Sequence, residues 1–215
     1  MTLDSDNLID SIMASLDRVK FIKTGEIPDI SLYVDQVTSF IDERLKNTAR
    51  HRSEDRLLTK TMINNYAKND LIPPPDKKKY NKEHMLLLIF VYYFKNIMSI
   101  SDIQEMLGPI TERYFGKDGD TTIASVYEEV TGIEREQLEA LKKDVREKYR
   151  VAGETFSEVE AEEEREFLQL FSFICMLSFD VYIKKLMIEK IIDGYVEKKE
   201  VKKENRGRKN KKADS

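Results

Sequence analysis

Cysteine and histidine are both scarce in this chain, which has one Cys and two His among 215 residues. Cys175 alone cannot close a disulfide within the chain, and a single thiol is too few for a thiolate metal site. His51 and His84, without a glycine-rich phosphate loop, form no recognisable catalytic triad or P-loop. We therefore expect no enzyme activity, no metal and no cofactor, and the free thiol suits a reducing cytoplasm.

Glycine and proline are also rare, with 8 and 5 residues, whereas charged residues make up 35% of the chain. Long charged side chains lose little rotamer freedom in helices, so this composition predicts a mostly α-helical protein. A hydrophobic content of 40% is enough to bury a core in one domain or two small ones. The first ten residues carry acids and no basic or continuously apolar leader pattern, so we expect no secretory signal.

A continuous apolar run long enough to cross a bilayer is missing as well. The most membrane-like window, residues 167–183, contains Gln169 and Asp180 and falls short of the roughly 20 apolar residues that a spanning helix needs. We predict that this window forms a buried helix and that the protein has no membrane partner.

Charge is strongly segregated along the chain, although the net charge is only −4. Residues 44–82 hold 11 Lys or Arg against 4 Asp or Glu, and residues 197–215 hold 9 against 4. The remainder is acidic, most densely in residues 134–139 and 158–166. A basic segment on an acidic body suits contact with nucleic-acid phosphates, although a basic tail by itself is also typical of a solvated, disordered end.

Residues 56–80 have the pattern of a short helix followed by a wing. Thr59 is a suitable N-cap, and Ile63 and Tyr66 share the apolar side of the helix that it begins. Three prolines at residues 73–75 end this helix, because each lacks an N–H and biases its predecessor toward extended geometry. Residues 76–80, which include a lysine run, then form an exposed turn or wing.

Two further helices follow the wing. Asn81 can cap the first, although its run LLLIFVYYF would by itself also permit a buried strand. Ser99 and Asp102 resemble a capping box that starts a short helix ending at Gly108 and Pro109. This order of elements is typical of a winged helix-turn-helix.

The C-terminal half reads as long helices at residues 122–150 and 158–199. Between residues 167 and 192 the sequence is apolar around much of the helix, which therefore needs burial on more than one side. We divide the chain into a helical extension (1–27), the winged helix-turn-helix (28–110), a helical region suited to dimerisation (111–197) and a disordered basic tail (198–215).

The segment LTKTMINNYAKNDLIPPPDKKKYNKEHMLLLIFVYYFKNIMSISDIQEML resembles the DNA-binding domain of MerR-type bacterial regulators. That family's arginine and first tyrosine in the recognition helix are Asn64 and Asn65 here, and its turn glycine is Asp70. The segments IPDISLYVDQV and IIDGY more closely resemble a group of uncharacterised bacterial proteins that share a domain of unknown function. These resemblances imply a MerR-like winged helix-turn-helix domain followed by a helical C-terminal domain.

Nine residues of this segment are candidate DNA contacts. An asparagine amide can pair with an adenine edge in the major groove, Thr61 can meet a base edge, and the lysines can reach phosphates or the minor groove. Tyr80 is expected to anchor the wing. The full set is Lys60, Thr61, Asn64, Asn65, Lys68, Lys77, Lys78, Lys79 and Tyr80.

Two functions follow from these patterns. The first is a cytoplasmic, sequence-specific transcriptional regulator that binds double-stranded DNA. By resemblance to MerR-type proteins it acts as a homodimer through its C-terminal helices, which predicts a palindromic site. The alternative is an interaction adaptor that keeps the winged-helix scaffold without binding DNA.

Overall fold

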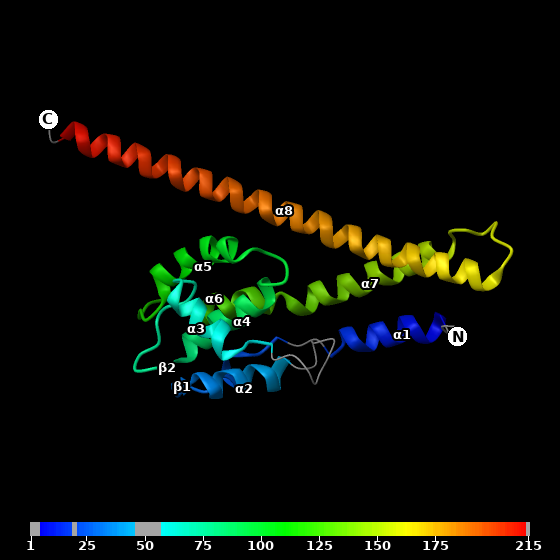
Figure 1. Ribbon diagram of the computed structural model, residues 1–215, viewed down its shortest axis with the longest axis horizontal. Coiled ribbons are helices and arrows are strands. Elements are labelled where there is room, and N and C mark those ends of the chain that lie inside the picture. The colour runs from blue at the N-terminus through cyan, green and yellow to red at the C-terminus, as the bar shows by residue number, and fades with distance from the viewer. Residues whose placement is uncertain (1–4, 19–20, 46–56, 214–215) are drawn as a thin grey trace.

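The protein is mostly helical, as its composition predicts, and two short strands interrupt the described helices. The computed structural model describes residues 5–18, 21–45 and 57–213 (Figure 1). Residues 46–56, which are part of the basic segment 44–82, lie outside these ranges. In chain order the elements are α1 (Ser5–Leu16), a short 3-10 helix η1 (Thr24–Glu26), β1 (Leu32–Tyr33), α2 (Val34–Leu45), α3 (Lys60–Lys68), β2 (Lys79–Tyr80), α4 (Lys82–Phe94), α5 (Ile100–Tyr114), α6 (Ile123–Gly132), α7 (Glu134–Gly153) and α8 (Glu162–Ala213).

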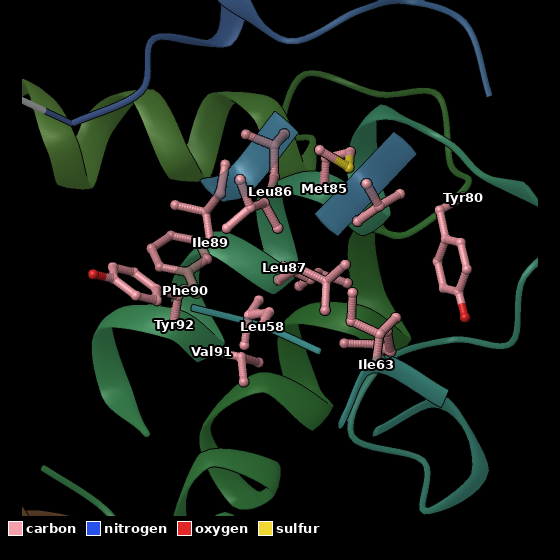
Figure 2. Packing of buried hydrophobic residues seen from close by; sticks show 14 of the residues in the cluster. Leu58, Ile63, Tyr80, Met85, Leu86, Leu87, Ile89, Phe90, Val91 and Tyr92 are labelled. Atoms are coloured by element: carbon pink, nitrogen blue, oxygen red, sulfur yellow. The ribbon is translucent and has the colours of Figure 1, made fainter. Parts of the chain in front are cut away.

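Helix α4 forms the centre of the main hydrophobic cluster. Every residue from 84 to 92 is buried, so the run that also permitted a strand is a helix enclosed on all sides. Figure 2 shows the α4 side chains in the middle of the cluster, with Leu58 and Ile63 beside them and Tyr80 at the edge. The cluster extends to Ile22 before β1 and to Tyr127 in α6, beyond the expected limits of 28 and 110. The limits of the winged helix-turn-helix domain at residues 28 and 110 stay predictions.

Helix α3 begins and ends through local hydrogen bonds that its sequence specifies. The Thr59 hydroxyl accepts the Met62 N–H at 3.2 Å, which confirms the predicted N-cap. At the other end, the Leu71 N–H donates to the Tyr66 carbonyl at 2.9 Å across Asp70, whose φ is 55°. Asp tolerates this left-handed conformation better than most residues, so Asp70 takes the position where glycine is commonest.

The wing is a tight turn, residues 76–79, that leads into β2, and β2 pairs with β1 in a two-stranded antiparallel sheet. Leu32 of β1 pairs with Tyr80 of β2, and the Lys79 N–H closes the turn onto the Asp76 carbonyl at 2.8 Å. Lys77 and Lys78 occupy its two central positions with φ values of 47° and 66°. Positive φ at both central positions is the geometry of a type I′ turn, which usually selects Asn and Gly.

A second, smaller cluster joins α1, α7 and α8. Its buried members are Met13, Val145, Ala152 and Phe173. The α8 helix returns antiparallel along α7 (Figure 1), and Lys148 of α7 pairs with Asp180 of α8 at 2.9 Å. Further along, α8 passes α5, where the Lys199 ammonium lies 2.7 Å from the Glu105 carboxylate.

Three helix boundaries differ from those that the sequence predicts. Helix α5 continues through Pro109 to Tyr114, because Ile110 and Tyr114 pack against the main cluster and offset the missing hydrogen bond. The helix expected over residues 122–150 is divided between α6 and α7 at Ile133. Helix α8 runs to Ala213, across most of the expected disordered tail, since Lys and Glu favour helices.

The predicted burial of residues 167–183 is wrong for the single chain. The segment is helical, but one side alone packs on α7, as the 2% exposed Phe173 shows, while Phe167, Phe171 and Phe179 are more than half exposed. By length and composition alone, the stretch Glu162–Val201 contains a window apolar enough to span a membrane, and 6% of that window is buried. Such a helix is weak evidence for a membrane span.

Candidate nucleic-acid interface

The outer side of α3 carries the five candidate DNA contacts of this helix. Ile63 and Tyr66 point into the main cluster, and the helical repeat therefore places the polar residues between them on the exposed side. The exposed members are Lys60, Thr61, Asn64, Asn65 and Lys68. Lys60 forms an exposed ion pair with Asp35 of α2, which competes only weakly with a phosphate because both groups are well solvated. The structure thus brings these five side chains onto one surface.

The wing places further positive charge beside α3. Lys77 and Lys78 are exposed at the tip of the turn, whereas Lys79 is half-buried with its ammonium 5.0 Å from the centre of the Tyr33 ring. The Tyr80 hydroxyl lies 3.5 Å from the Asn64 amide oxygen, so the wing and the outer side of α3 are neighbours. Eight of the nine candidates therefore remain accessible within one contiguous region.

Tyr80 is the exception among the candidates. It is 2% exposed, and burial raises the pKa of its hydroxyl above the usual value. Its ring packs edge to face on His84, with the ring centres 5.4 Å apart. Tyr80 therefore positions the wing, as its expected anchoring role requires, and offers almost no surface to a ligand.

His84 contacts the residues that flank the wing on both sides. Its Nδ1 accepts the Asn81 N–H at 3.2 Å, its Nε2 lies 3.4 Å from the Pro74 carbonyl, and its ring packs on Phe115. Burial lowers the pKa of this imidazole, although the backbone carbonyls of Pro74 and Pro73 partly oppose the shift. This role of His84 could not be predicted from the sequence, because a lone histidine near a helix start carries no distinctive pattern.

Acidification is expected to destabilise the protein through His84. Since the folded-state pKa lies below the value of about 6.5 in an unfolded chain, the unfolded state binds the proton more readily. The contribution of His84 to the free energy of unfolding is complete above about pH 6.5 and decreases as the pH falls toward the folded-state pKa. Urea unfolding at several pH values between 5 and 8 measures this decrease. His84→Gln is the control, and an equal pH dependence in both proteins would contradict the assignment.

Tyr33 is an exposed aromatic residue that the sequence did not mark as part of the site. Its side chain is 52% exposed on β1, directly across the sheet from Lys79. The cation–π contact with Lys79 restrains that lysine on the sheet. The pairing of β1 with β2 joins residues far apart in sequence, so no local pattern identifies this neighbour.

The site belongs to a mostly helical domain built around α4. Its two parts are the polar outer side of α3 and the lysine-tipped wing, which lie next to each other. Residues 22–130, about half of the chain, match the family described as Domain of unknown function (DUF1836), and the chain belongs to this family. The match includes β1, α2, α3, the wing, α4 and α5. It confirms the resemblance to a family whose domain has no known function. No curated protein and no solved structure matches the chain.

Proposed function

We propose that this protein is a cytoplasmic, sequence-specific transcriptional regulator with a MerR-like winged helix-turn-helix domain. The observation that carries the proposal is the single surface shared by the outer side of α3 and the lysine-tipped wing. That surface combines amide groups on a helix with cations on a neighbouring turn. Reading helices and wings of DNA-binding proteins use these two kinds of group for bases and for phosphates, respectively.

In the proposed complex α3 enters the major groove. Asn64 and Asn65 each present a donor and an acceptor, which match the N6 and N7 positions of adenine. Lys60 and Lys68, near the two ends of α3, contact phosphates on either side. The wing reaches the adjacent backbone or minor groove with Lys77 and Lys78, while Tyr80 keeps the turn in place.

The proposed regulator is a homodimer that joins through its C-terminal helices. Two reading helices related by two-fold symmetry recognise a palindromic site with half-sites about one helical turn apart. The exposed apolar residues of α8 support this part of the proposal, because large exposed apolar patches mark interaction surfaces.

The same apolar surface also favours a second function, that of an adaptor that recruits another protein and does not bind DNA. In this version α3 and the wing are scaffold, and Asn64 and Asn65 stand where the MerR-type pattern has phosphate-binding residues. The two functions differ in salt dependence. DNA binding weakens steeply with salt because counterions are released from the phosphates, whereas contact through apolar side chains changes little.

A selection from fragmented bacterial genomic DNA tests the proposal directly. The full chain is incubated with the fragments, bound DNA is sequenced, and the enriched fragment is titrated against a scrambled one at two salt concentrations. A regulator enriches a palindromic motif and prefers it over the scrambled fragment at both concentrations. Equal, weak or absent binding to both fragments would overturn sequence-specific reading and favour the adaptor.

The two asparagines are expected to set sequence preference. Asn64→Ala or Asn65→Ala should reduce discrimination between the selected site and its adenine-substituted variants by about 1–3 kcal/mol. Lys68→Ala is the control, since loss of a phosphate contact weakens binding to all sequences about equally. Fluorescence anisotropy with a panel of single-base variants measures both effects. Unchanged preference in both asparagine variants would remove α3 as the reading helix.

A further inference from the structure

The outer face of the β1–β2 sheet carries a tyrosine and a lysine that contact each other. Tyr33 and Lys79 are cross-strand partners, so their side chains lie on the same face of the sheet. Successive residues of a strand point to opposite faces, and Tyr80 is buried in the main cluster, so this pair lies on the side away from the cluster. The Lys79 ammonium is 5.0 Å from the centre of the Tyr33 ring, yet Tyr33 remains 52% exposed.

Both members of the Tyr33–Lys79 pair are restrained before any ligand binds. The Tyr33 N–H donates to the side-chain oxygen of Gln36 at 2.9 Å, which fixes the end of β1 on the first turn of α2. The cation–π contact holds the lysine against the ring. Restrained side chains lose less conformational entropy on binding than mobile ones. The pair is therefore a preorganised combination of an exposed hydroxyl and an ammonium.

The lysine of this pair differs from the two lysines that begin the neighbouring helices. Lys60 at the start of α3 is ion-paired with Asp35. Lys82 at the start of α4 is ion-paired with Asp29 at 2.7 Å. In the part of the chain that the structure describes, Lys79 contacts the aromatic ring and forms no ion pair with a carboxylate. Its charge is thus available to an anionic ligand.

We propose that the Tyr33 hydroxyl and the Lys79 ammonium bind one phosphate of double-stranded DNA, beside the groove that α3 enters. The inference rests on the proposed function and adds Tyr33 to its contacts. The Lys60–Asp35 ion pair joins the first turn of α3 to the first turn of α2, which follows Tyr33 directly. The Tyr33–Lys79 pair therefore lies between the start of α3 and the wing tip. In the proposed complex the backbone that borders the major groove passes over this position.

The chemistry of the pair favours the DNA backbone over the bases. Both groups donate hydrogen bonds, and bonds from such donors to an anionic phosphate oxygen are charge-assisted and strong. The exposed ring can stack only on an unpaired base, because the bases of a duplex are already stacked on each other. The pair thus positions the protein on the duplex and does not read its sequence.

Tyr33→Phe tests the hydroxyl while it keeps the ring that contacts Lys79. The affinity of the full chain for the duplex enriched by the genomic selection should fall about 10-fold, as for one lost hydrogen bond to a charged group. The slope of log affinity against log salt should stay the same, because no cation is lost. Lys79→Gln should instead lower this slope by about 1. Tyr182→Phe, on the exposed side of α8, is the matched control and should bind like the parent chain.

Replacement of single phosphates by neutral methylphosphonates locates the contact. Several positions should weaken binding by the parent chain, and the penalty at one of them should shrink in both Tyr33→Phe and Lys79→Gln, since groups that share a partner are not additive. Penalties at the other positions should stay as in the parent chain. A folding defect would change all positions about equally and cannot imitate this result. Penalties that shrink at two different positions would overturn the shared phosphate.

The outcomes separate this inference from the proposed function. Sequence-specific binding with equal affinities of the parent chain and Tyr33→Phe would overturn the Tyr33 contact alone. A parent chain that binds no duplex would overturn both the proposed function and the contact. Tighter binding to a single-stranded oligonucleotide of the same sequence, lost in Tyr33→Ala and kept in Tyr33→Phe, would show that the ring stacks on a base and would overturn the phosphate contact.

Discussion

Lys77→Asn together with Lys78→Gly is expected to lower DNA affinity about 50-fold at 0.1 M salt, if each lysine neutralises one phosphate. The same change should lower the slope of log affinity against log salt by about 2. Asn and Gly suit the two central positions of the wing turn, where both lysines have positive φ. The substitution should therefore raise the free energy of unfolding by about 1 kcal/mol while it removes both charges.

The Asn-Gly variant removes the two charges without straining the turn, so its effect on binding reports the loss of charge alone. A pair of alanines does not allow this distinction. Alanine at positive φ remains strained, so a loss of binding in Lys77→Ala plus Lys78→Ala could come from a distorted turn. Lys77→Arg plus Lys78→Arg is the matched control, because it keeps both charges and the same backbone strain. Binding should persist in that control. An unchanged affinity and salt slope in the Asn-Gly variant would show that the wing does not contact DNA.

Tyr127→Ala should produce the largest loss of stability, about 3–5 kcal/mol, because it removes a large aromatic side chain from a closed site. Tyr127 in α6 is fully buried, packs edge to face on Phe90 of α4, and donates a hydrogen bond of 2.6 Å to the Ile22 carbonyl. It thus joins α6, α4 and the segment before β1. Urea unfolding of the full chain, followed by circular dichroism, measures the change.

The hydroxyl and the ring of Tyr127 make separate contributions to the free energy of unfolding. Tyr127→Phe keeps the ring but leaves the Ile22 carbonyl without this donor, at a cost of about 1–3 kcal/mol. Tyr182→Ala on the exposed side of α8 is the matched control for loss of a tyrosine and should change stability little below the dimerisation concentration. If Tyr127→Ala cost no more than Tyr182→Ala, α6 would not be a structural part of the main cluster.

Local signals predicted the elements that form the candidate site. Thr59, Asn81 and Ser99 each cap the helix that follows, because capping depends on a few adjacent residues. The apolar side of α3 likewise follows from the spacing of Ile63 and Tyr66. The exposure of seven of the nine candidate residues follows from the same periodicity and from the lysine run after the prolines.

Features that depend on contacts between distant segments could not be predicted. The continuation of α5 through Pro109 depends on packing of Ile110 and Tyr114 against the main cluster, which outweighs a local helix-breaking signal. The sheet partner of the wing, Tyr33, lies more than forty residues before Lys79. Composition indicated that residues 167–192 of α8 need a partner on more than one side. It did not reveal that the single chain covers residues 167–183 only on the side that faces α7.

The continuity of α8 restricts how this protein can change length. This uninterrupted helix carries both Phe173 and Lys199. Phe173 packs in the second cluster with α1 and α7, and Lys199 contacts Glu105 of α5. Each inserted residue between them turns the distal part by about 100° and moves it by about 1.5 Å. A single insertion would therefore point Lys199 away from α5, whereas seven residues restore the direction to within about 20°. Homologues that differ in length here should do so in steps of about seven residues.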